Sequence, residues 1–293
     1  MRFGYSTMNA ADGLLPAKLA RQLEERGFES MWVPEHTHIP TSRQTPHPST
    51  NPLPDGYLHM MDPLVSLAAA ASATERLLLG TAVCLVLQHD VIALAKAVAT
   101  LDVISGGRLI LGVGTGWNEE ELADHRPDVP FKSRYSAMAE RVAALRALWA
   151  ESENGFAGRW DRVSPSWVFP KPVHGTVPIA LGNWGALGMD HAARYADEWM
   201  PIDALMPGDG RPDIGAGVER FRQMVAEHGR DPDSVPISLF MFSRPTDARI
   251  ERYAELGVQR VVVSVPSAGL STAEQILRDL DDITPVVERY SND

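Results

Sequence analysis

The chain has 293 residues, 44% hydrophobic and 22% charged, so it can bury a full core. A formal net charge of −11 argues against a broad basic face for nucleic acid, and one cysteine excludes an intramolecular disulfide framework. The N-terminus lacks an apolar signal region, and the longest weakly polar stretch, 64–73, is too short to cross a bilayer. We therefore predict a cytoplasmic protein that binds neither nucleic acid nor membranes.

Short apolar strands alternate with helical patterns along the whole chain. Strands are expected at 3–6, 28–33, 77–83, 109–113, 177–181, 198–202, 236–241 and 260–265. Helices are expected at 14–26, 61–73, 91–104, 134–150, 186–195, 211–228, 247–256 and 272–287, with Asp62 and Pro63 starting the second. Eight strands, each followed by a helix, predict an α/β fold of the (β/α)8 TIM-barrel type. An open doubly wound sheet is the alternative.

No internal domain boundary is evident, so we expect one domain spanning 1–293. Three segments are too long for plain connections and are expected to be insertion loops: 37–60, 151–176 and 203–210. The first and third follow the carboxyl ends of strands. Barrel active sites are built at that end.

The fourth strand runs into alternating glycines, Gly112, Gly114 and Gly116. Glycines there let the backbone approach a flat ring or an anion, or they simply permit a tight turn. Asn118 can cap the helix that follows, with Glu121 completing a capping box. A dinucleotide fingerprint fits poorly, because Trp117 stands where its third glycine belongs.

The second strand ends in Glu35 and His36, with His38 two residues on. Histidine is the side chain best suited to move a proton near neutral pH, although a loop histidine can also be a plain surface residue. The His-x-His spacing also suits the metal pair of a metal-dependent barrel hydrolase. That site needs further ligands at other strand ends, where Asp203 stands alone, so we expect no metal.

Other strand ends offer weaker candidates. Cys84 follows the third strand and is interpreted as a buried small residue rather than a nucleophile. The fifth strand leads into a second glycine-flanked helix start, which can seat a phosphate or form a tight turn: Gly182, Asn183, Trp184 and Gly185. Trp199 and Met200, at the end of the sixth strand, are expected in the core.

These motifs together resemble the bacterial luciferase-like superfamily. The resemblance rests on Ala95-Lys96, Ala99-Thr100-Leu101-Asp102, Ser105-Gly106-Gly107-Arg108, Gly112-Val113-Gly114-Thr115-Gly116-Trp117, Gly4, Trp32-Val33-Pro34-Glu35-His36, Pro170-Lys171-Pro172 and Ala196-Asp197-Glu198-Trp199-Met200-Pro201. It covers nearly the whole chain in the right order. The Pro-Glu-His ending of the second strand, followed by a proline-rich loop, is most similar to the F420-dependent oxidoreductases.

The resemblance implies a deazaflavin at the carboxyl rim of the barrel, with Glu35 and His36 close to it. It implies a non-proline cis peptide at Ala82–Val83, under the ring. The residues implied to bind the cofactor are Ala82, Val83, Cys84, Gly112, Gly114, Thr115, Gly116, Trp117, Gly182, Asn183, Trp184 and Gly185. Two positions depart from relatives: Trp117 replaces a glutamate, and Asn183 replaces a second glycine.

The resulting hypothesis is hydride transfer between coenzyme F420 and a small organic substrate. His36 would give or take the proton, and Glu35 would tune it. The nearest alternative is an FMN-dependent two-component monooxygenase, and a non-catalytic flavin-binding protein is a further one. A homodimer is expected from the resemblance.

Overall fold

The computed structural model describes residues 1–48, 52–151, 153, 155–182, 185–205, 213–264 and 272–291. Its main sheet has eight parallel strands: β1 (Arg2–Ser6), β2 (Ser30–Val33), β3 (Leu78–Thr81), β4 (Leu109–Val113), β7 (Ile179–Leu181), β8 (Glu198–Trp199), β9 (Ser238–Met241) and β10 (Arg260–Val263). Their order is β8-β7-β4-β3-β2-β1-β10-β9, and the parallel bridges Trp199–Ile237 and Ile202–Phe240 join the two end strands. The sheet is therefore a nearly closed barrel, which confirms the predicted (β/α)8 fold.

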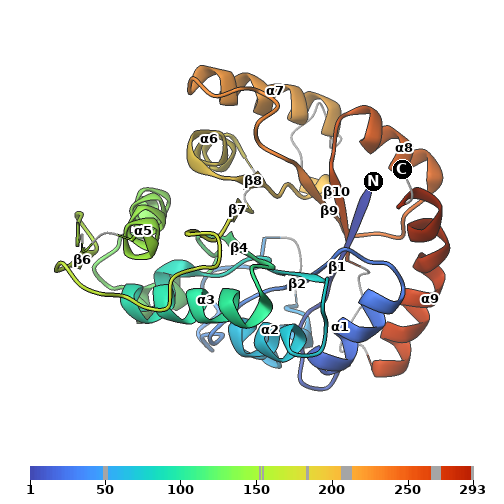
Figure 1. Cartoon of the computed structure of the whole chain (residues 1–293), viewed down its shortest axis with the longest axis horizontal. Helices are drawn as coiled ribbons and strands as arrows, with labels where there is room; N and C mark the ends of the chain where they lie inside the picture. The colour runs from blue at the N-terminus through green and yellow to red at the C-terminus, as the bar shows by residue number, and fades with distance from the viewer. Residues whose placement is uncertain are drawn as a thin grey trace.

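Helices surround this sheet (Figure 1). They are α1 (Pro16–Glu25), α2 (Pro63–Ala71), α3 (Val91–Ser105), α4 (Glu119–His125), α5 (Arg134–Trp149), α6 (Ala186–Tyr195), α7 (Ile214–Glu227), α8 (Asp247–Glu255) and α9 (Ala273–Tyr290). Asp62 caps α2 as predicted, because its Oδ1 accepts the Val65 N–H at 2.8 Å.

Sequence and structure differ in two places that matter for the site. The third strand was expected to reach residue 83 but ends at Thr81, because the chain leaves the sheet in a bulge at Ala82–Val83. The expected insertion 151–176 contains an antiparallel pair, β5 (Phe156–Ala157) and β6 (Arg162–Val163). That pair is too short to show a strand period in the sequence.

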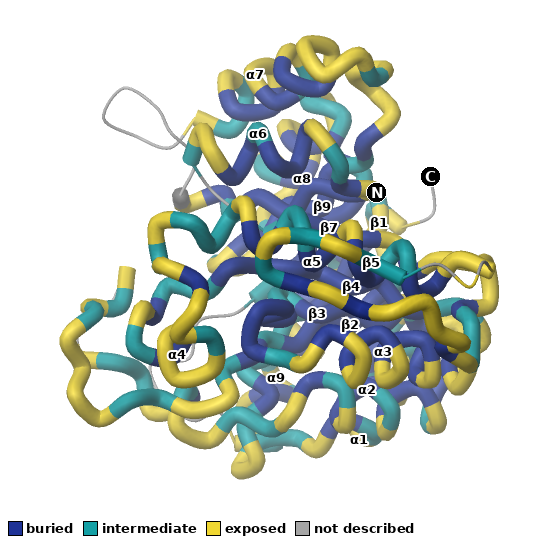
Figure 2. Tube along the Cα trace, turned by 90° about the vertical axis from the view of Figure 1, so that its left-hand side faces the viewer, coloured by how far each residue is buried: buried dark blue, intermediate teal, exposed yellow. Residues whose placement is uncertain are grey.

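The barrel interior is filled by one side chain from each of six strands or their ends: Trp32, Ile110, Ala180, Met200, Phe240 and Val262. A Cβ at Gly80 would collide with the Trp32 ring, so glycine is required there. Trp199 faces outward and stacks on Phe221 with ring centroids 4.1 Å apart. Met200 and Trp199 are thus both core residues, as expected, and Figure 2 shows the buried strands at the centre of the molecule.

The amino-terminal end of the barrel is closed by a buried arginine. Arg260, at the start of β10, donates from Nη1 to Glu198 at 2.5 Å and from Nε to Glu29 at 2.6 Å. These three side chains lie at the starts of their strands, so a ligand has to enter from the opposite end. Within the described part of the chain, no helix is both long enough and apolar enough to cross a membrane.

Candidate active site

His36 follows β2 and is held on both sides of its ring. Its Nδ1 lies 2.7 Å from Glu121 Oε2, and the Trp117 indole N–H donates to its Nε2 at 3.1 Å. Since Nε2 accepts a hydrogen bond, the proton of the neutral ring sits on Nδ1 and faces the carboxylate. The side chain is only 7% exposed. His36 is therefore a nearly buried imidazole with a fixed orientation and a fixed tautomer.

Glu121 comes from α4 and was misinterpreted in the sequence. Asn118 caps this helix as predicted, because its Oδ1 accepts the Glu121 N–H at 3.2 Å. The Glu121 carboxylate does not complete a capping box. It is fully buried, and its Oε1 accepts the Thr37 N–H at 3.1 Å while its Oε2 faces His36. The capping pattern therefore predicted a local role for Glu121, whereas its carboxylate contacts His36, which is distant in the sequence.

Glu35 was expected to tune His36, and this pairing is wrong. Its Oε2 accepts the Leu85 N–H at 2.6 Å, and its Oε1 lies 2.7 Å from His89 Nε2. Burial alone would lower the pKa of His89, but the hydrogen bond and charge of Glu35 outweigh burial and raise it. Glu35 therefore anchors the segment after β3, and Glu121 takes the place expected for it beside His36.

Cys84 lies beside this ion pair and is completely buried. Burial, followed by the nearby Glu35 charge, raises the pKa of its thiol well above the ordinary value. The thiol is thus protonated, which agrees with its interpretation as a small buried residue. Within the described residues, the one group with metal-ligand spacing is Glu35, Cys84 and His89.

The histidine pair considered for a metal does not share a site. His36 bonds to Glu121, whereas His38 Nε2 lies 3.0 Å from Asp124 Oδ2 near the surface. Asp203, the further ligand that the hydrolase hypothesis offered, contacts Tyr253 and Arg249 after β8. The three residues therefore have separate partners.

The bulge after β3 explains the glycines of the neighbouring strands. The Ala82–Val83 peptide is cis, as the resemblance implied. A Cβ at Gly114 would collide with Val83 Cγ2, and a Cβ at Gly182 would lie 2.6 Å from Val83 Cγ1. A Cβ at Gly112 would collide with the carbonyl oxygen of Thr81, the last residue of β3. Gly114 and Gly182 therefore make room for the bulge, and Gly112 makes room for the end of the strand before it.

The bulge also gives the barrel mouth an apolar surface. Ala82 and Val83 are partly exposed, while Thr81 before them and Cys84 after them are buried. The Cys84 backbone is tied to β4 through the Gly112 carbonyl at 2.7 Å. A fixed apolar surface at a barrel mouth suits a flat ring.

The predicted insertion 37–60 packs over Trp117 and His36. The Trp117 ring centroid lies 5.0 Å from that of His47, and the Tyr57 centroid lies 5.4 Å from that of His36. Glu120 of α4 fixes the loop by accepting the Gln44 N–H at 2.8 Å and the Thr45 N–H at 3.0 Å. With the Thr45 hydroxyl as the largest cause, these bonds lower the pKa of Glu120 to about 2.

Two other predicted cofactor positions lie on the same rim. Thr115 is buried after β4, and Gly116 follows it with φ +73°, a conformation that favours glycine. The expected phosphate seat is at the start of α6, where Gly185 is the N-cap and no side chain of the described residues caps the helix. The first N–H groups of a helix are a common site for an anion. Asn183 and Trp184 lie outside the described residues.

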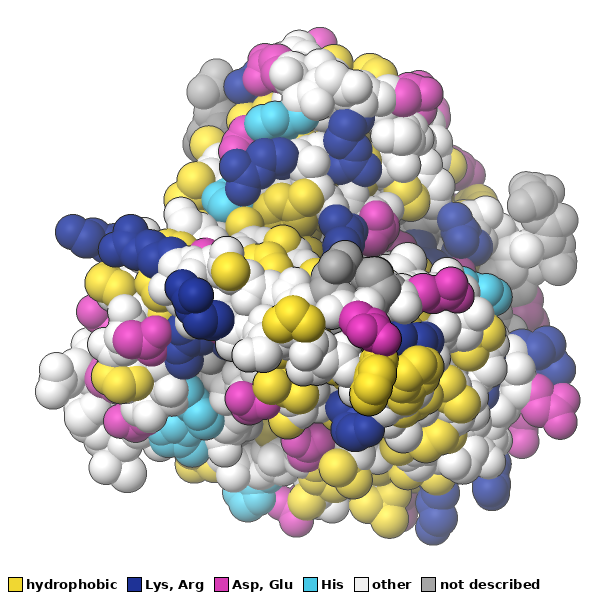
Figure 3. All heavy atoms as spheres, turned by 60° about the vertical axis from the view of Figure 1, so that its left-hand side comes forward, with side chains coloured by type: hydrophobic (Ala, Val, Ile, Leu, Met, Phe, Trp, Pro, Cys, Tyr) yellow, Lys and Arg dark blue, Asp and Glu magenta, His cyan; other side chains and the backbone are white. Residues whose placement is uncertain are grey.

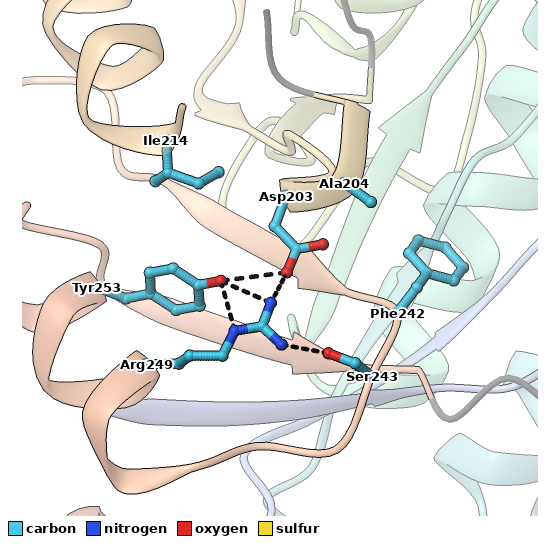
Figure 4. Close-up of a pocket in the computed structure, with 7 residues that line it drawn as sticks. All are labelled: Asp203, Ala204, Ile214, Phe242, Ser243, Arg249 and Tyr253. Carbon is cyan, nitrogen blue, oxygen red and sulfur yellow. Dashed lines mark hydrogen bonds and ion pairs between the residues drawn. The ribbon is translucent and has the colours of Figure 1, made fainter. Parts of the chain in front are cut away.

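An open pocket of about 760 Å³ lies at the carboxyl ends of β8 and β9 (Figure 4). Its polar wall is Asp203, which accepts from the Tyr253 hydroxyl at 3.1 Å and from Arg249, while Arg249 also donates to Ser243. The remaining lining is apolar: Ala204, Ile214 and Phe242. Of the predicted insertion 203–210, only 203–205 is described. No sequence signal linked Arg249 and Tyr253 of α8 to this rim.

A family model of luciferase-like monooxygenases matches residues 1–285. The chain belongs to this family. An uncharacterised protein of Mycobacterium tuberculosis is 39% identical over 99% of this chain and 98% of its own length. The F420-dependent glucose-6-phosphate dehydrogenase of Kineococcus radiotolerans is 30% identical over 68% of this chain and 56% of its own.

Two solved structures show the same fold at low identity. The monooxygenase RslO1 of Streptomyces bottropensis superposes with a TM-score of 0.75 and 19% identity, over 99% of this chain and 100% of that one. An F420-dependent secondary alcohol dehydrogenase superposes with a TM-score of 0.74 and 17% identity, over 98% of both chains. This luciferase-like protein thus has both F420-dependent and monooxygenase neighbours.

Proposed function

We propose that this luciferase-like protein is an F420-dependent oxidoreductase that moves a hydride between the deazaflavin and a small organic substrate. The observation that carries the proposal is the buried His36–Glu121 pair. Its residues follow β2 and β4, the two strands that flank β3, and the Ala82–Val83 bulge follows β3. Relatives at about 30% identity that are F420-dependent support it.

The residues on the rim fit such a cofactor. The apolar bulge offers a surface for a flat ring, and the start of α6 offers N–H groups for its phosphate. When bound, the deazaflavin supplies the acceptor or donor of the hydride. The protein then has to orient the substrate and handle the proton that accompanies the hydride.

His36 is the group that handles this proton. Its Nε2 takes the proton when a hydroxyl is oxidised and gives it when a carbonyl is reduced. Glu121 stabilises the imidazolium that forms, because its carboxylate already accepts the Nδ1 proton. Trp117 holds Nε2 in the absence of substrate, so a substrate oxygen has to replace the indole N–H.

The experiment that tests the cofactor is a fluorescence-quench titration of the apoprotein with F420 and, separately, with FMN, each oxidised and reduced. Micromolar or tighter binding of F420 with weak binding of FMN is expected. The reverse preference would assign the protein to the FMN-dependent monooxygenases, the alternative to this proposal. Binding of neither would contradict the proposal.

A His36→Ala variant tests the proton role. It is expected to bind F420 like the wild type and to lose turnover by about 10²- to 10⁴-fold with a confirmed substrate. Wild-type turnover in this variant would remove His36 from the mechanism. The substrate itself is to be found by screening small alcohols and carbonyl compounds with the preferred cofactor.

We also propose that the protein works as a homodimer, with a second copy on the α2–α3 face. This face consists of the outer sides of α2 and α3 and the segment 167–173 beside them. Val65, Ile92 and Trp167 are 71%, 46% and 77% exposed on it. Figure 3 shows exposed hydrophobic side chains gathered at the lower right of the molecule.

Helices that are apolar on all sides are normally covered on all sides, and α2 and α3 have this pattern. The charged residue on the outer side of these two helices, Lys96, donates to the Phe169 carbonyl at 2.6 Å. The same face of a second copy could therefore pack against this one without bringing unpaired charges together.

The cytoplasmic location stays a prediction.

A further inference from the structure

The Glu121 carboxylate, buried beneath His36, has a second contact that leads outward. Its Oε1 accepts the Thr37 N–H at 3.1 Å and lies 3.5 Å from the Thr37 hydroxyl oxygen. Thr37 is exposed, whereas Glu121 is completely buried. The Thr37 hydroxyl is therefore the outer neighbour of the carboxylate that bonds to His36.

Two surface histidines meet the same hydroxyl. Thr37 Oγ1 lies 2.7 Å from His125 Nε2 and 3.0 Å from His38 Nδ1. His38 continues to the exposed Asp124, whose Oδ2 lies 3.0 Å from His38 Nε2. The two imidazole rings have centroids 5.5 Å apart.

We propose that these contacts form a proton relay that connects His36 to the solvent through Glu121, Thr37 and the pair His38 and His125. The proposal deepens the function proposed above and depends on it for its biological purpose. Thr37, His38 and His125 are positioning residues in it, because they act through His36 and do not touch the substrate.

Each group of the relay passes on one proton for each proton that it receives. In the direction of oxidation, a proton arrives at His36 Nε2, and the proton on Nδ1 passes to Glu121 Oε2. Rotation of the protonated carboxyl group about its Cγ–Cδ bond then brings this proton to the side of Thr37. Thr37 Oγ1 accepts it and releases its own hydroxyl proton to a surface imidazole, which loses a proton to water. His36 is left with its proton on Nε2, and reduction runs the same steps backwards and returns the ring to its Nδ1–H form.

A hydroxyl is suited to the central position because it can accept one proton while donating another. Thr37 Oγ1 also lies 3.1 Å from Gln88 Oε1, so its single hydrogen has several acceptors to choose from. The groups that act electrostatically on His125 are His38, Glu121, His89 and Asp124. Burial is the largest influence on its pKa, which is lowered. A lowered pKa suits an imidazole that releases protons to water near neutral pH.

A purely structural reading is that Thr37 only ties the loop to α4. The two readings differ in what the hydroxyl does to the exchange of the His36 Nδ1 proton. This proton bonds to a buried carboxylate and can be followed by NMR in the apoprotein labelled with ¹⁵N-histidine. The resonance is assigned by its loss in a His36→Gln variant.

The experiment compares water exchange of this proton in the wild type, Thr37→Val and Thr37→Ser. The valine is isosteric and lacks the hydroxyl, so exchange should slow by about a hundredfold, the range of one positioned proton-transfer group. The serine keeps the hydroxyl and should exchange at nearly the wild-type rate. Equal rates in all three proteins would overturn the relay.

A His38→Asn/His125→Asn variant keeps Thr37 and removes both terminal imidazoles. It is expected to slow exchange as well, whereas a wild-type rate would end the relay at Thr37 and overturn the role of the two histidines. The measurement needs neither F420 nor substrate. Loss of F420 binding with intact relay behaviour would thus contradict only the proposed function, and F420 turnover with unaltered exchange would contradict only the relay.

Discussion

Glu121 Oε2 lies 2.7 Å from Nδ1 of His36, although the two residues are 85 positions apart in the chain. The contact joins the end of β2 to α4, which begins just after the glycines of β4. It gives the barrel mouth one imidazole with a defined orientation. In the proposed mechanism, proton transfer at His36 therefore depends on how α4 is placed.

Replacing Glu121 by glutamine removes the charge that stabilises a protonated His36 while keeping the side-chain volume. We expect turnover with a confirmed substrate to fall about a hundredfold, with the F420 dissociation constant nearly unchanged. Steady-state kinetics and the F420 titration measure the two effects separately.

Glu119→Gln is the matched control, because Glu119 lies on the same helix and its side chain is exposed. It should retain wild-type turnover. A similar loss of turnover in both variants would show that the charge of α4 matters in general and that the contact with His36 does not.

Local sequence patterns were sufficient to predict features that depend on residues adjacent in the chain. The apolar runs predicted the strands, and Asn118 predicted the start of α4. The position of His36 directly after β2 made it a candidate for proton transfer. The resemblance supplied the cis peptide at Ala82–Val83, which no periodicity indicates.

Partners that meet across the rim could not be predicted in this way. Glu35 and Glu121 are both carboxylates near His36, and only the folded loops decide which one reaches the imidazole. The Asp203–Arg249 contact joins η4 (Asp203–Leu205), the short segment after β8, to α8. Such pairs depend on barrel closure and loop conformation, which a single sequence does not encode locally.

The glycines beside the bulge lead to a stability prediction. In Gly114→Ala the new methyl group collides with Val83 Cγ2, so we expect a loss of about 1–3 kcal/mol in the free energy of unfolding. Urea denaturation followed by circular dichroism measures this loss.

The collision has one identified partner, and a second substitution can remove it. Val83→Ala in the Gly114→Ala background should recover most of the lost stability. If the double variant is less stable than either single variant, the glycine is required by its backbone and not by the Val83 side chain.

The Glu35–His89 pair predicts a dependence of stability on pH. Because the folded-state pKa of His89 is raised above its ordinary value of 6.5, the pair stabilises the fold fully below pH 6.5. This contribution is lost as the pH rises through the folded-state value. Urea unfolding at a series of pH values should therefore show a decline on the alkaline side that is absent in His89→Gln.

His174→Gln serves as the control for this series, since His174 is an exposed histidine away from Glu35. Its unfolding free energy should follow that of the wild type across the same pH range. An identical alkaline decline in His89→Gln would assign the pH dependence to another group.

The α2–α3 face predicts the oligomeric state. Val65→Asp and Ile92→Asp each place a charge on a surface that we expect a second copy to cover. Burying an unpaired carboxylate is strongly unfavourable, so either variant should convert a dimer into a monomer. Size-exclusion chromatography with light scattering measures the mass directly.

Leu187→Asp is the control, because it places the same charge on the exposed side of α6. It should leave the dimer intact. A wild-type protein that is monomeric at micromolar concentration, or a dimer that survives both α2–α3 substitutions, would contradict the assignment of this face.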